Sequence, residues 1–187
     1  MLAVPVQRPF DSHGHLFEVK WDGVRAIAFI SRGKVRLADR KGRGITHHFR
    51  DVAAALSRAV KADGVVLDGE IVAPDETGVP YLAPVMRRFY DDRPTRGRMP
   101  LNYEVFDVLY EDYRPLLTVP LVHRKEALRE TLRPNDVVHL AHYEEEAGIA
   151  FFEAATELGL EGMIGKAKSG VYVPGQPSAD WLNVKAY

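Results

Sequence analysis

The dominant pattern in this sequence is a succession of short β-branched and aromatic runs separated by turn-forming residues. Arg25–Ile30 and Lys34–Ala38 predict two strands around a turn at Arg32-Gly33. Further strands are expected at Leu16–Val19, Val65–Ala73, Leu101–Tyr110, Val137–Ala141, Met163–Ala167 and Leu182–Ala186. Hairpin signals outnumber strand–helix–strand units, so the sequence predicts an α+β fold with mainly antiparallel sheets flanked by helices.

Four segments carry helical signals. They are Asp51–Val60 with Asp51 as its N-cap, Pro80–Phe89, Pro120–Leu132 with Pro120 as the first helical residue, and Ile149–Leu158, which ends near Gly159. The acidic run Glu144–Glu146 is expected to be a solvated helix entry. Asp91–Pro100 is polar and rich in proline and glycine, which predicts an exposed loop.

Composition narrows the class of protein. The 187 residues fit one domain or two closely joined lobes, and 46% hydrophobic residues suffice for a core. The absence of cysteine excludes disulfides and thiolate metal sites, and it agrees with a reducing cytosol. Met1–Phe10 lacks the apolar run of a signal peptide, and no stretch approaches the ~18 apolar residues of a membrane span. We therefore expect a cytoplasmic protein with no membrane partner.

Charge and histidine content exclude two further classes of site. A net charge of −1 argues against strong, non-specific DNA binding by the whole surface, although it is compatible with a local basic groove. The close histidine pairs, His47-His48 and His13 with His15, have no third ligand nearby in the sequence. We therefore expect no zinc site.

Lys20 lies in the segment E-V-K-W-D-G-V-R (residues 18–25), which contains the spaced motif K-x-D-G-x-R. On average amino-acid usage, such a match arises by chance in roughly one chain in several hundred of this length. Taken alone, Lys20 also reads as a solvated lysine at the end of a strand, and Asp22-Gly23 as an ordinary turn.

Three further motifs follow Lys20 in order: D-G-E at 68–70, E-G at 161–162 and W-L-N-V-K at 181–185. The series resembles the covalent nucleotidyltransferases, which are ATP-dependent DNA ligases, RNA ligases and mRNA capping enzymes, over about residues 16–187. The resemblance implies the ATP-grasp-like DNA ligase/mRNA capping nucleotidyltransferase fold. It also implies that Lys20 attacks the α-phosphate of a nucleotide and carries the nucleoside monophosphate as a phosphoramidate.

A nucleophilic lysine must be neutral, whereas a free lysine has a pKa of about 10.4. Positive charge from Arg25, Lys185 or a bound Mg²⁺, together with desolvation in a closed cleft, would lower that pKa. By the resemblance, Lys185 holds the α-phosphate as negative charge grows in the transition state, and Lys166 assists.

The resemblance implies further contacts to the nucleotide. Glu18 lies near the adenine amino group, which favours ATP over GTP, and Val19 lines the same pocket. Arg25 contacts the ribose or the 3′-end region, and Gly23 lets the backbone approach the ligand closely.

Two further contacts rest on weaker matches. Phe106 is expected to stack on the purine, although its segment also reads as a core strand. Arg40, in D-R-K-G (39–42), resembles the S-R-N-G element that touches the nucleotide, although it also reads as a surface arginine.

Two carboxylates are candidates for the metal. Glu70 and Glu161, placed in D-G-E and E-G contexts, are expected to meet in the fold and to bind Mg²⁺ (or Mn²⁺), directly or through water. The same carboxylates are also suited to contact the ribose.

Within the family, residues 103–128 look most like bacterial ATP-dependent DNA ligases, including the ligase part of bacterial end-joining proteins. Only 19 residues precede Lys20, whereas NAD-dependent ligases need an additional N-terminal region, so ATP is favoured. Asn183 replaces the first lysine of the usual final motif, and Ser178 lacks the arginine that normally precedes it. These departures imply a lost or replaced phosphate contact.

The leading hypothesis is the adenylation domain of an ATP-dependent DNA ligase, comprising residues 1–187 without an OB-fold domain. It would act on nicked double-stranded DNA near the bacterial nucleoid, with an OB-fold domain or a repair protein as its partner in trans. Alone, it is expected to bind nicked DNA weakly. The alternatives are an RNA ligase and a catalytically weak nucleotide-binding module of a repair complex.

Overall fold

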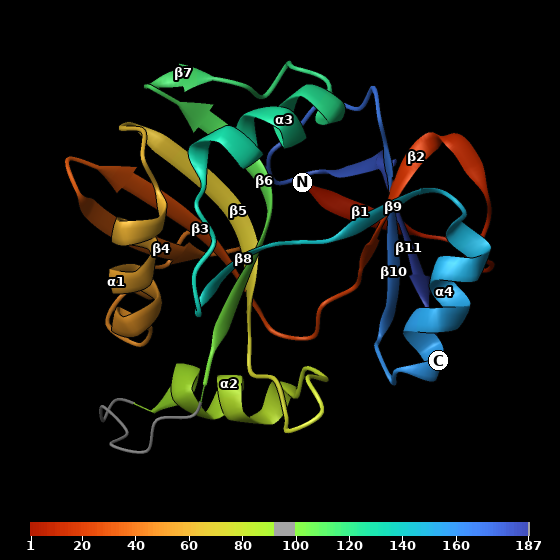
Figure 1. The fold of residues 1–187 in the computed structure, drawn as a ribbon, viewed down its shortest axis with the longest axis horizontal. Coiled ribbons are helices and arrows are strands. Elements are labelled where there is room, and N and C mark those ends of the chain that lie inside the picture. Colours follow the sequence, from red (N-terminus) through yellow and green to blue (C-terminus); the bar gives the residue numbers. More distant parts are fainter. Residues whose placement is uncertain (92–99, 187) are drawn as a thin grey trace.

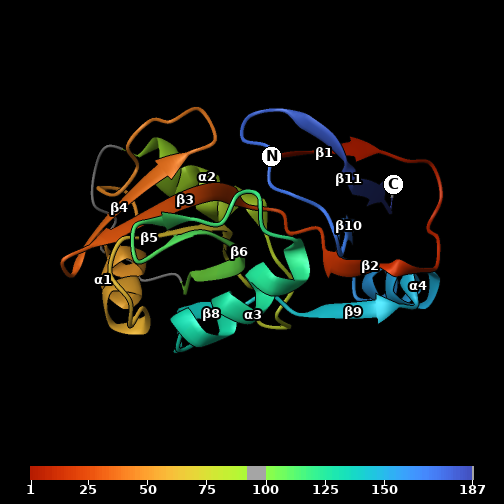
Figure 2. The ribbon, with the colours of Figure 1, turned by 90° about the horizontal axis from the view of Figure 1, so that it is seen from above.

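The computed structural model describes residues 1–91 and 100–186. Within them the chain forms two β-sheets that lie side by side, with helices on their outer sides (Figures 1 and 2). The strands are β1 (Leu2–Pro5), β2 (Ser12–Val19), β3 (Val24–Ser31), β4 (Lys34–Asp39), β5 (Val65–Val72), β6 (Asn102–Glu111), β7 (Arg114–Pro115), β8 (Val138–Leu140), β9 (Tyr143–Glu146), β10 (Gly162–Ala167) and β11 (Pro177–Lys185). The helices are α1 (Arg50–Ala59), α2 (Leu82–Tyr90), α3 (Leu121–Thr131) and α4 (Gly148–Glu157).

The first sheet joins strands from the two ends of the chain. Its order is β1-β11-β10-β2-β9, and only the β1–β11 pair is parallel among its described strands. Helix α4 packs against β2 and β10. Phe17, Met163 and Val184 form the buried apolar cluster of this sheet.

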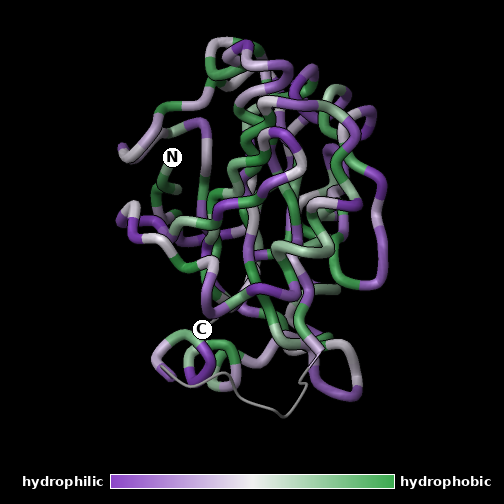
Figure 3. Tube along the Cα trace, turned by 90° about the vertical axis from the view of Figure 1, so that its left-hand side faces the viewer, coloured by the Kyte–Doolittle hydropathy of each residue, from purple (hydrophilic) through white to green (hydrophobic). Residues whose placement is uncertain are grey.

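The second sheet has the order β4-β3-β5-β6-β7, with β8 added in parallel beside β6. Helices α1, α2 and α3 contribute residues such as Leu56, Val85 and Leu128 to its large apolar core. Figure 3 shows hydrophobic stretches gathered along the central strands and hydrophilic ones along the outer loops. This core therefore fixes β3 and β5, the two strands that follow or carry the predicted motifs.

Strand β3 has two different faces because its side chains alternate. Val24, Ala26, Ala28 and Ile30 are buried and belong to the apolar core that includes α1. The residues between them, Arg25, Ile27, Phe29 and Ser31, are only partly buried and point to the opposite side, which we call the open face of the second sheet. Arg25, the last residue of the motif around Lys20, lies at one end of this open face.

The structure confirms the α+β class with mainly antiparallel sheets and every predicted strand, with shifts of a few residues at most element ends. The acidic run Glu144–Glu146 was wrongly predicted as a helix entry, because it forms most of edge strand β9. Asp51 is not an N-cap but lies inside α1, where its carboxylate pairs with Arg88 at 2.5 Å. Pro120 precedes α3 as its N-cap rather than starting it.

Three strands, β1, β7 and β9, have no counterpart among the predictions. The loop predicted at Asp91–Pro100 falls largely on residues 92–99, which lie outside the described residues. None of the described helices combines the length and the apolarity needed to cross a bilayer.

Candidate active site

Lys20 follows β2 at the point where β2 pairs with β10. Val19 lies opposite Met163, and the Lys20 backbone N–H donates to the Gly162 carbonyl at 3.0 Å. This register sets Lys20 beside Glu161, and the ammonium and carboxylate form an ion pair with both side chains largely buried. The predicted nucleophile and one of the two predicted carboxylates are therefore in direct contact.

A cavity of about 120 Å³ opens beside Lys20 between the two sheets. Its lining includes Lys20 and six of the residues expected to bind the nucleotide, namely Glu18, Val19, Arg25, Glu70, Phe106 and Lys166. The aromatic side chains of Trp21 and Trp181 and the aliphatic side chain of Ile164 also line the wall. Segments from all along the chain thus converge on one site.

Glu18 is buried between two lysines on different elements. Its carboxylate oxygens lie 2.7 Å from Lys166 Nζ on β10 and 2.7 Å from Lys125 Nζ on α3. The Lys166 contact is a hydrogen bond, whereas the angles of the Lys125 contact depart from hydrogen-bond alignment. Burial alone would raise the pKa of Glu18, but the charges of Lys125 and Lys166 together outweigh burial and hold that pKa below its ordinary value.

The Lys166 ammonium also lies against two aromatic rings. Its Nζ is 4.2 Å from the Phe106 centroid and 4.3 Å from the Trp181 centroid, and the two rings meet edge to face at 5.9 Å. Burial lowers the pKa of Lys166 to about 8; the Glu18 carboxylate acts in the opposite direction, and the nearby Lys125 charge adds to the lowering. The face of Phe106 expected to stack on a purine is therefore occupied by a cation in this structure.

Arg25 is fixed in the wall by a two-pronged ion pair. Its Nε and Nη2 donate to the two carboxylate oxygens of Asp68 at 3.0 and 2.6 Å, and the Tyr172 hydroxyl donates to Asp68 at 2.7 Å. Asp68 is fully buried. The guanidinium also lies 5.5 Å from the ring centroids of both Phe106 and Trp181. Arg25 thus presents a rigid positive edge to the cavity.

Glu70 lies opposite Arg25 in the register between β3 and β5. Its side chain is partly buried and lines the small cavity. Burial raises the pKa of Glu70 to about 8, with the Arg25 charge acting in the opposite direction. Among the described residues, no group of three or more histidines and acids is placed to hold a metal ion.

Arg40 and Lys185 lie outside the small cavity. Arg40 lines a neighbouring hollow of about 390 Å³ together with Arg25 and Glu70. Lys185, which is exposed, lies opposite Gly162 at the end of β11. Asn183, on the same strand, has a buried side-chain oxygen with no hydrogen-bond partner among the described residues.

Gly23 has a structural role besides the approach to the ligand that is expected from the sequence. A Cβ atom at this position would lie 2.2 Å from the Ile71 carbonyl oxygen on β5. The close approach that requires glycine is therefore to the neighbouring strand, which brings the Lys20 loop against the motif strand that carries Glu70.

Several residues of the site were not predicted. Asp68 was visible in the D-G-E motif, but nothing in the sequence showed that it pairs with Arg25. Trp21 and Trp181 belong to the motifs around Lys20 and Lys185, but the sequence assigned them no function. The structure places both side chains in the wall of the cavity. Lys125 carried no motif signal, because its contact with Glu18 depends on how α3 packs.

Fold and site together define a class: a nucleotidyltransferase domain with a lysine–carboxylate pair at the junction of two largely antiparallel sheets. Residues 1–185 match the family model described as ATP dependent DNA ligase domain, and the chain therefore belongs to that family.

Individual relatives agree with this assignment. The chain is 30% identical over 187 residues to the SPbeta prophage-derived DNA ligase-like protein LigB of Bacillus subtilis, covering all of this chain and 67% of that protein. It is 31% identical to a DNA ligase of Thermococcus onnurineus, covering 90% of this chain but only 32% of that relative. A structure of mycobacterial DNA ligase D complexed with ATP and MES superposes with a TM-score of 0.79 at 28% identity, covering 99% of this chain and 60% of the other.

Proposed function

We propose that this chain catalyses the adenylation step of an ATP-dependent DNA ligase. The observation that carries the proposal is the Lys20–Glu161 ion pair at a cavity lined by Glu18, Arg25 and Glu70. A nucleophile, a carboxylate that can receive its proton and groups suited to a nucleotide are all within one site. The similarity to the structure of mycobacterial DNA ligase D, which was determined with bound ATP, supports this proposal.

In the first step, the Lys20 amine attacks the α-phosphorus of ATP. A P–N bond forms, the bond between the α-phosphorus and the bridging oxygen breaks, and pyrophosphate leaves. The proton lost by Lys20 passes to Glu161, its ion-pair partner, or to solvent. Lys185 at the end of β11 is suited to stabilise the charge on the α-phosphate.

Binding of the base requires Lys166 to leave the face of Phe106. The Glu18 carboxylate accepts a hydrogen bond from the adenine amino group, and Ile164 lies on β10 near the rings of Phe106 and Trp181 as part of the same wall. Arg25 and Arg40 line the hollow that continues beyond the small cavity, where ribose and phosphates would extend. These roles make the site selective for a purine nucleotide with a hydrogen-bond donor on its base.

The donor set fits Mg²⁺ (or Mn²⁺) better than a softer metal. Magnesium is commonly held by one or two carboxylates together with substrate phosphates and water, and Glu70 and Glu161 are the carboxylates beside Lys20. When bound, the ion would neutralise charge on the phosphates during transfer. Glu161 and Glu70 would orient it from the protein side.

The acceptor in the later steps is a nick in double-stranded DNA. A 5′-phosphate oxygen attacks the lysyl-AMP phosphorus, which breaks the P–N bond and returns Lys20 to its free form. The 3′-hydroxyl then attacks the activated 5′-phosphate, and AMP leaves. We propose that an OB-fold domain, or a repair protein that supplies one, completes the clamp around the nick.

The proposal is tested by incubating the protein with α-labelled ATP and Mg²⁺ and resolving it on a denaturing gel. Wild-type protein and a Lys61→Ala control, which changes an exposed lysine beyond α1, should carry the label. Lys20→Ala should carry none, and label on that variant would disprove the assignment. EDTA should prevent labelling, and comparison of nicked DNA with nicked RNA as acceptor separates the DNA ligase from the RNA ligase alternative.

A further inference from the structure

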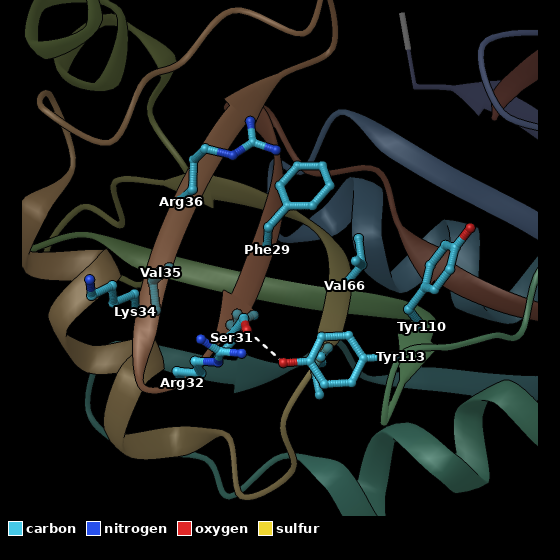
Figure 4. Close-up of a pocket in the computed structure, with 12 residues that line it drawn as sticks. Phe29, Ser31, Arg32, Lys34, Val35, Arg36, Val66, Tyr110 and Tyr113 are labelled. Carbon is cyan, nitrogen blue, oxygen red and sulfur yellow. Dashed lines mark hydrogen bonds between the residues drawn. The ribbon is translucent and has the colours of Figure 1, made fainter.

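A second hollow, of about 760 Å³, lies on the open face of the second sheet, around the β3–β4 turn (Figure 4). We call it the β3–β4 groove. Phe29 and Val66 form its apolar floor. Tyr110 and Tyr113 form one wall, and Lys34 and Arg36 form a rim of positive charge.

The groove has a strong local positive charge in a chain whose net charge is −1. Arg32, Lys34 and Arg36 all line it, and none of them forms an ion pair among the described residues. No acidic side chain appears among the described residues of the lining. The Arg36 guanidinium lies 4.0 Å from the centroid of the Phe29 ring. Figure 4 shows the two side chains next to each other, so this cation lies over the floor of the groove. The groove thus offers unpaired positive charge beside an apolar surface.

The tyrosine wall is fixed in place although Tyr113 is 60% exposed. The Tyr113 hydroxyl is hydrogen-bonded to Ser31 at 2.7 Å and donates to Asp63 at 2.8 Å. Its backbone has a φ of 61°, which is unfavourable for tyrosine. A Cβ atom at Gly64 would lie 2.4 Å from the Tyr113 ring, so glycine there is what allows this packing. An exposed aromatic held by a strained backbone and two hydrogen bonds indicates a surface shaped for contact.

The groove is continuous with the active site along the open face. Phe29, Val66 and Tyr110 also line a further hollow of about 390 Å³, which is distinct from the one that includes Glu70. Arg25 and Arg40 line this further hollow as well. Arg25 belongs to the wall of the Lys20 cavity as well. Side chains of one strand, β3, therefore run from the nucleotide site to the groove.

We propose that the β3–β4 groove binds the phosphate backbone of the duplex that flanks the nick. The proposal rests on the proposed ligase function, because that function places the nick beside Lys20 and Arg25. Phosphates would bind Lys34 and Arg36 at the rim, and deoxyribose carbons would pack on Phe29 and the tyrosines. Unpaired cations and fixed aromatic rings suit a sugar–phosphate chain, and the shared face places them on the path of the DNA.

The geometry predicts which phosphates are involved. Arg25 and Ser31 are six residues apart on β3, and at ~3.4 Å per residue the groove begins roughly 14 Å and ends roughly 20 Å from Arg25. Phosphates of one strand are spaced by about 3.4 Å along the duplex axis. With that axis along β3 and the nick at Arg25, the groove would meet the fourth to sixth phosphates from the nick.

The first experiment compares two double variants, each of which reverses the charge of one lysine and one arginine. Lys34→Glu/Arg36→Glu reverses the rim of the groove, whereas Arg58→Glu/Lys61→Glu reverses exposed cations in and just beyond α1, on the opposite side of the sheet. Affinity for a nicked duplex with a non-ligatable 3′ end is measured by fluorescence anisotropy between ~50 and ~200 mM salt. The groove variant should bind about tenfold more weakly and should reduce the salt slope by about 2, while the control retains the wild-type slope to within about half of that change.

The second experiment removes charge from the DNA instead. Neutral methylphosphonates replace the fourth to sixth phosphates on one side of the nick, and then on the other. On one side of the nick, the methylphosphonates should weaken wild-type binding about as much as the groove variant does. They should not affect the groove variant itself, because its contact with these phosphates is already lost.

The proposal is overturned if both double variants bind alike, if neither set of methylphosphonates affects the wild type, or if the wild type does not bind the nicked duplex at ~50 mM salt. Labelling of Lys20 by α-labelled ATP needs no DNA and is measured on every protein. Loss of labelling in the wild type would refute the adenylation function, whereas normal labelling with unchanged DNA affinity would refute the groove alone.

Discussion

At the scale of residues, one of the buried polar atoms without a hydrogen-bond partner lies next to the nucleophile. Trp21 Nε1 is buried in the wall of the Lys20 cavity and has no hydrogen-bond partner among the described residues. A buried donor without a partner costs about 1–3 kcal/mol, and such groups are rare unless a ligand or water satisfies them. The residue that follows the nucleophile is therefore a candidate hydrogen-bond donor to the nucleotide.

Trp21→Phe tests this role, because phenylalanine keeps an aromatic ring and removes the N–H group. A hydrogen bond to a charged phosphate contributes about 1.5–3 kcal/mol, so we expect ATP to bind at least tenfold more weakly. Nucleotide titration measures the affinity, and the melting temperature without nucleotide serves as the control for folding. Unchanged ATP affinity in a well-folded variant would show that the indole does not contact the ligand.

At the scale of elements, helix α3 connects the two sheets through two consecutive buried cations. Arg124 donates to both carboxylate oxygens of Asp107 on β6 at 2.8 and 2.9 Å, and to the Gly170 carbonyl at 3.0 Å. Lys125 reaches Glu18 on β2 in the other sheet. Helix α3 thus binds the second sheet through Arg124 and the first sheet through Lys125. These two contacts hold the two sheets at a set distance across the nucleotide cavity.

Removal of Lys125 should therefore destabilise the whole domain. Lys125→Met leaves Glu18 buried with Lys166 as its one cationic partner among the described residues, and breaking a buried ion pair costs about 3–5 kcal/mol. Glu126→Gln, which removes an exposed partner of His123 on the same helix, should cost less than about 1 kcal/mol. Urea unfolding measures both variants. Equal stability of the two would mean that the buried contact contributes no more than a surface pair.

Elements with local signals could be predicted from the sequence. The β3–β4 hairpin followed from the turn at Arg32-Gly33, where both residues have positive φ angles of 50° and 71°, and from β-branched residues on either side. Strand β1 could not be predicted, because it depends on its pairing with β11, where Leu2 lies opposite Pro177. Strand β9 was missed because three of its four residues are glutamates, which only an exposed sheet edge accommodates.

The active site also contains residues that the sequence could identify and contacts that it could not. Lys20 and Glu161 could each be singled out from the sequence because each stands in a short motif, whereas their ion pair is a finding of the structure. The Glu18–Lys125 contact and the Arg25–Asp68 pair could not be predicted, since they follow from burial and strand register rather than from spacing. Whether Glu70 and Glu161 bind a metal stays a prediction.

At the scale of the whole molecule, Glu18 links stability to pH. Its pKa in the folded protein is below that of an exposed glutamate, near 4.5, because the two lysine charges outweigh burial. A lowered folded-state pKa means that Glu18 contributes stability above about 4.5, and that this contribution is lost as the pH falls further. Wild-type protein should therefore lose stability in this acidic range.

The same linkage predicts how Lys125→Met responds to acid. Without Lys125, burial of Glu18 is less compensated, so its pKa rises and less stability depends on its ionisation. The difference in melting temperature between wild type and variant should be largest near pH 7 and should narrow below about pH 4.5. A difference that stays constant from pH 7 to pH 3 would show that Lys125 does not act through the charge of Glu18.

The order of strands in the first sheet has a consequence for how the protein is made. Strand β2 lies between β9 and β10, which follow it by more than a hundred residues, and β1 pairs with β11. During synthesis, the segment carrying Lys20 therefore leaves the ribosome long before the strands that hold it in place. In the second sheet, β3 pairs with both β4 and β5, and all three strands end before residue 73, so this part of the sheet can form early. We expect the nucleophile to meet Glu161 only after β10 has been synthesised, so that the reactive pair forms later than the first strands of the second sheet.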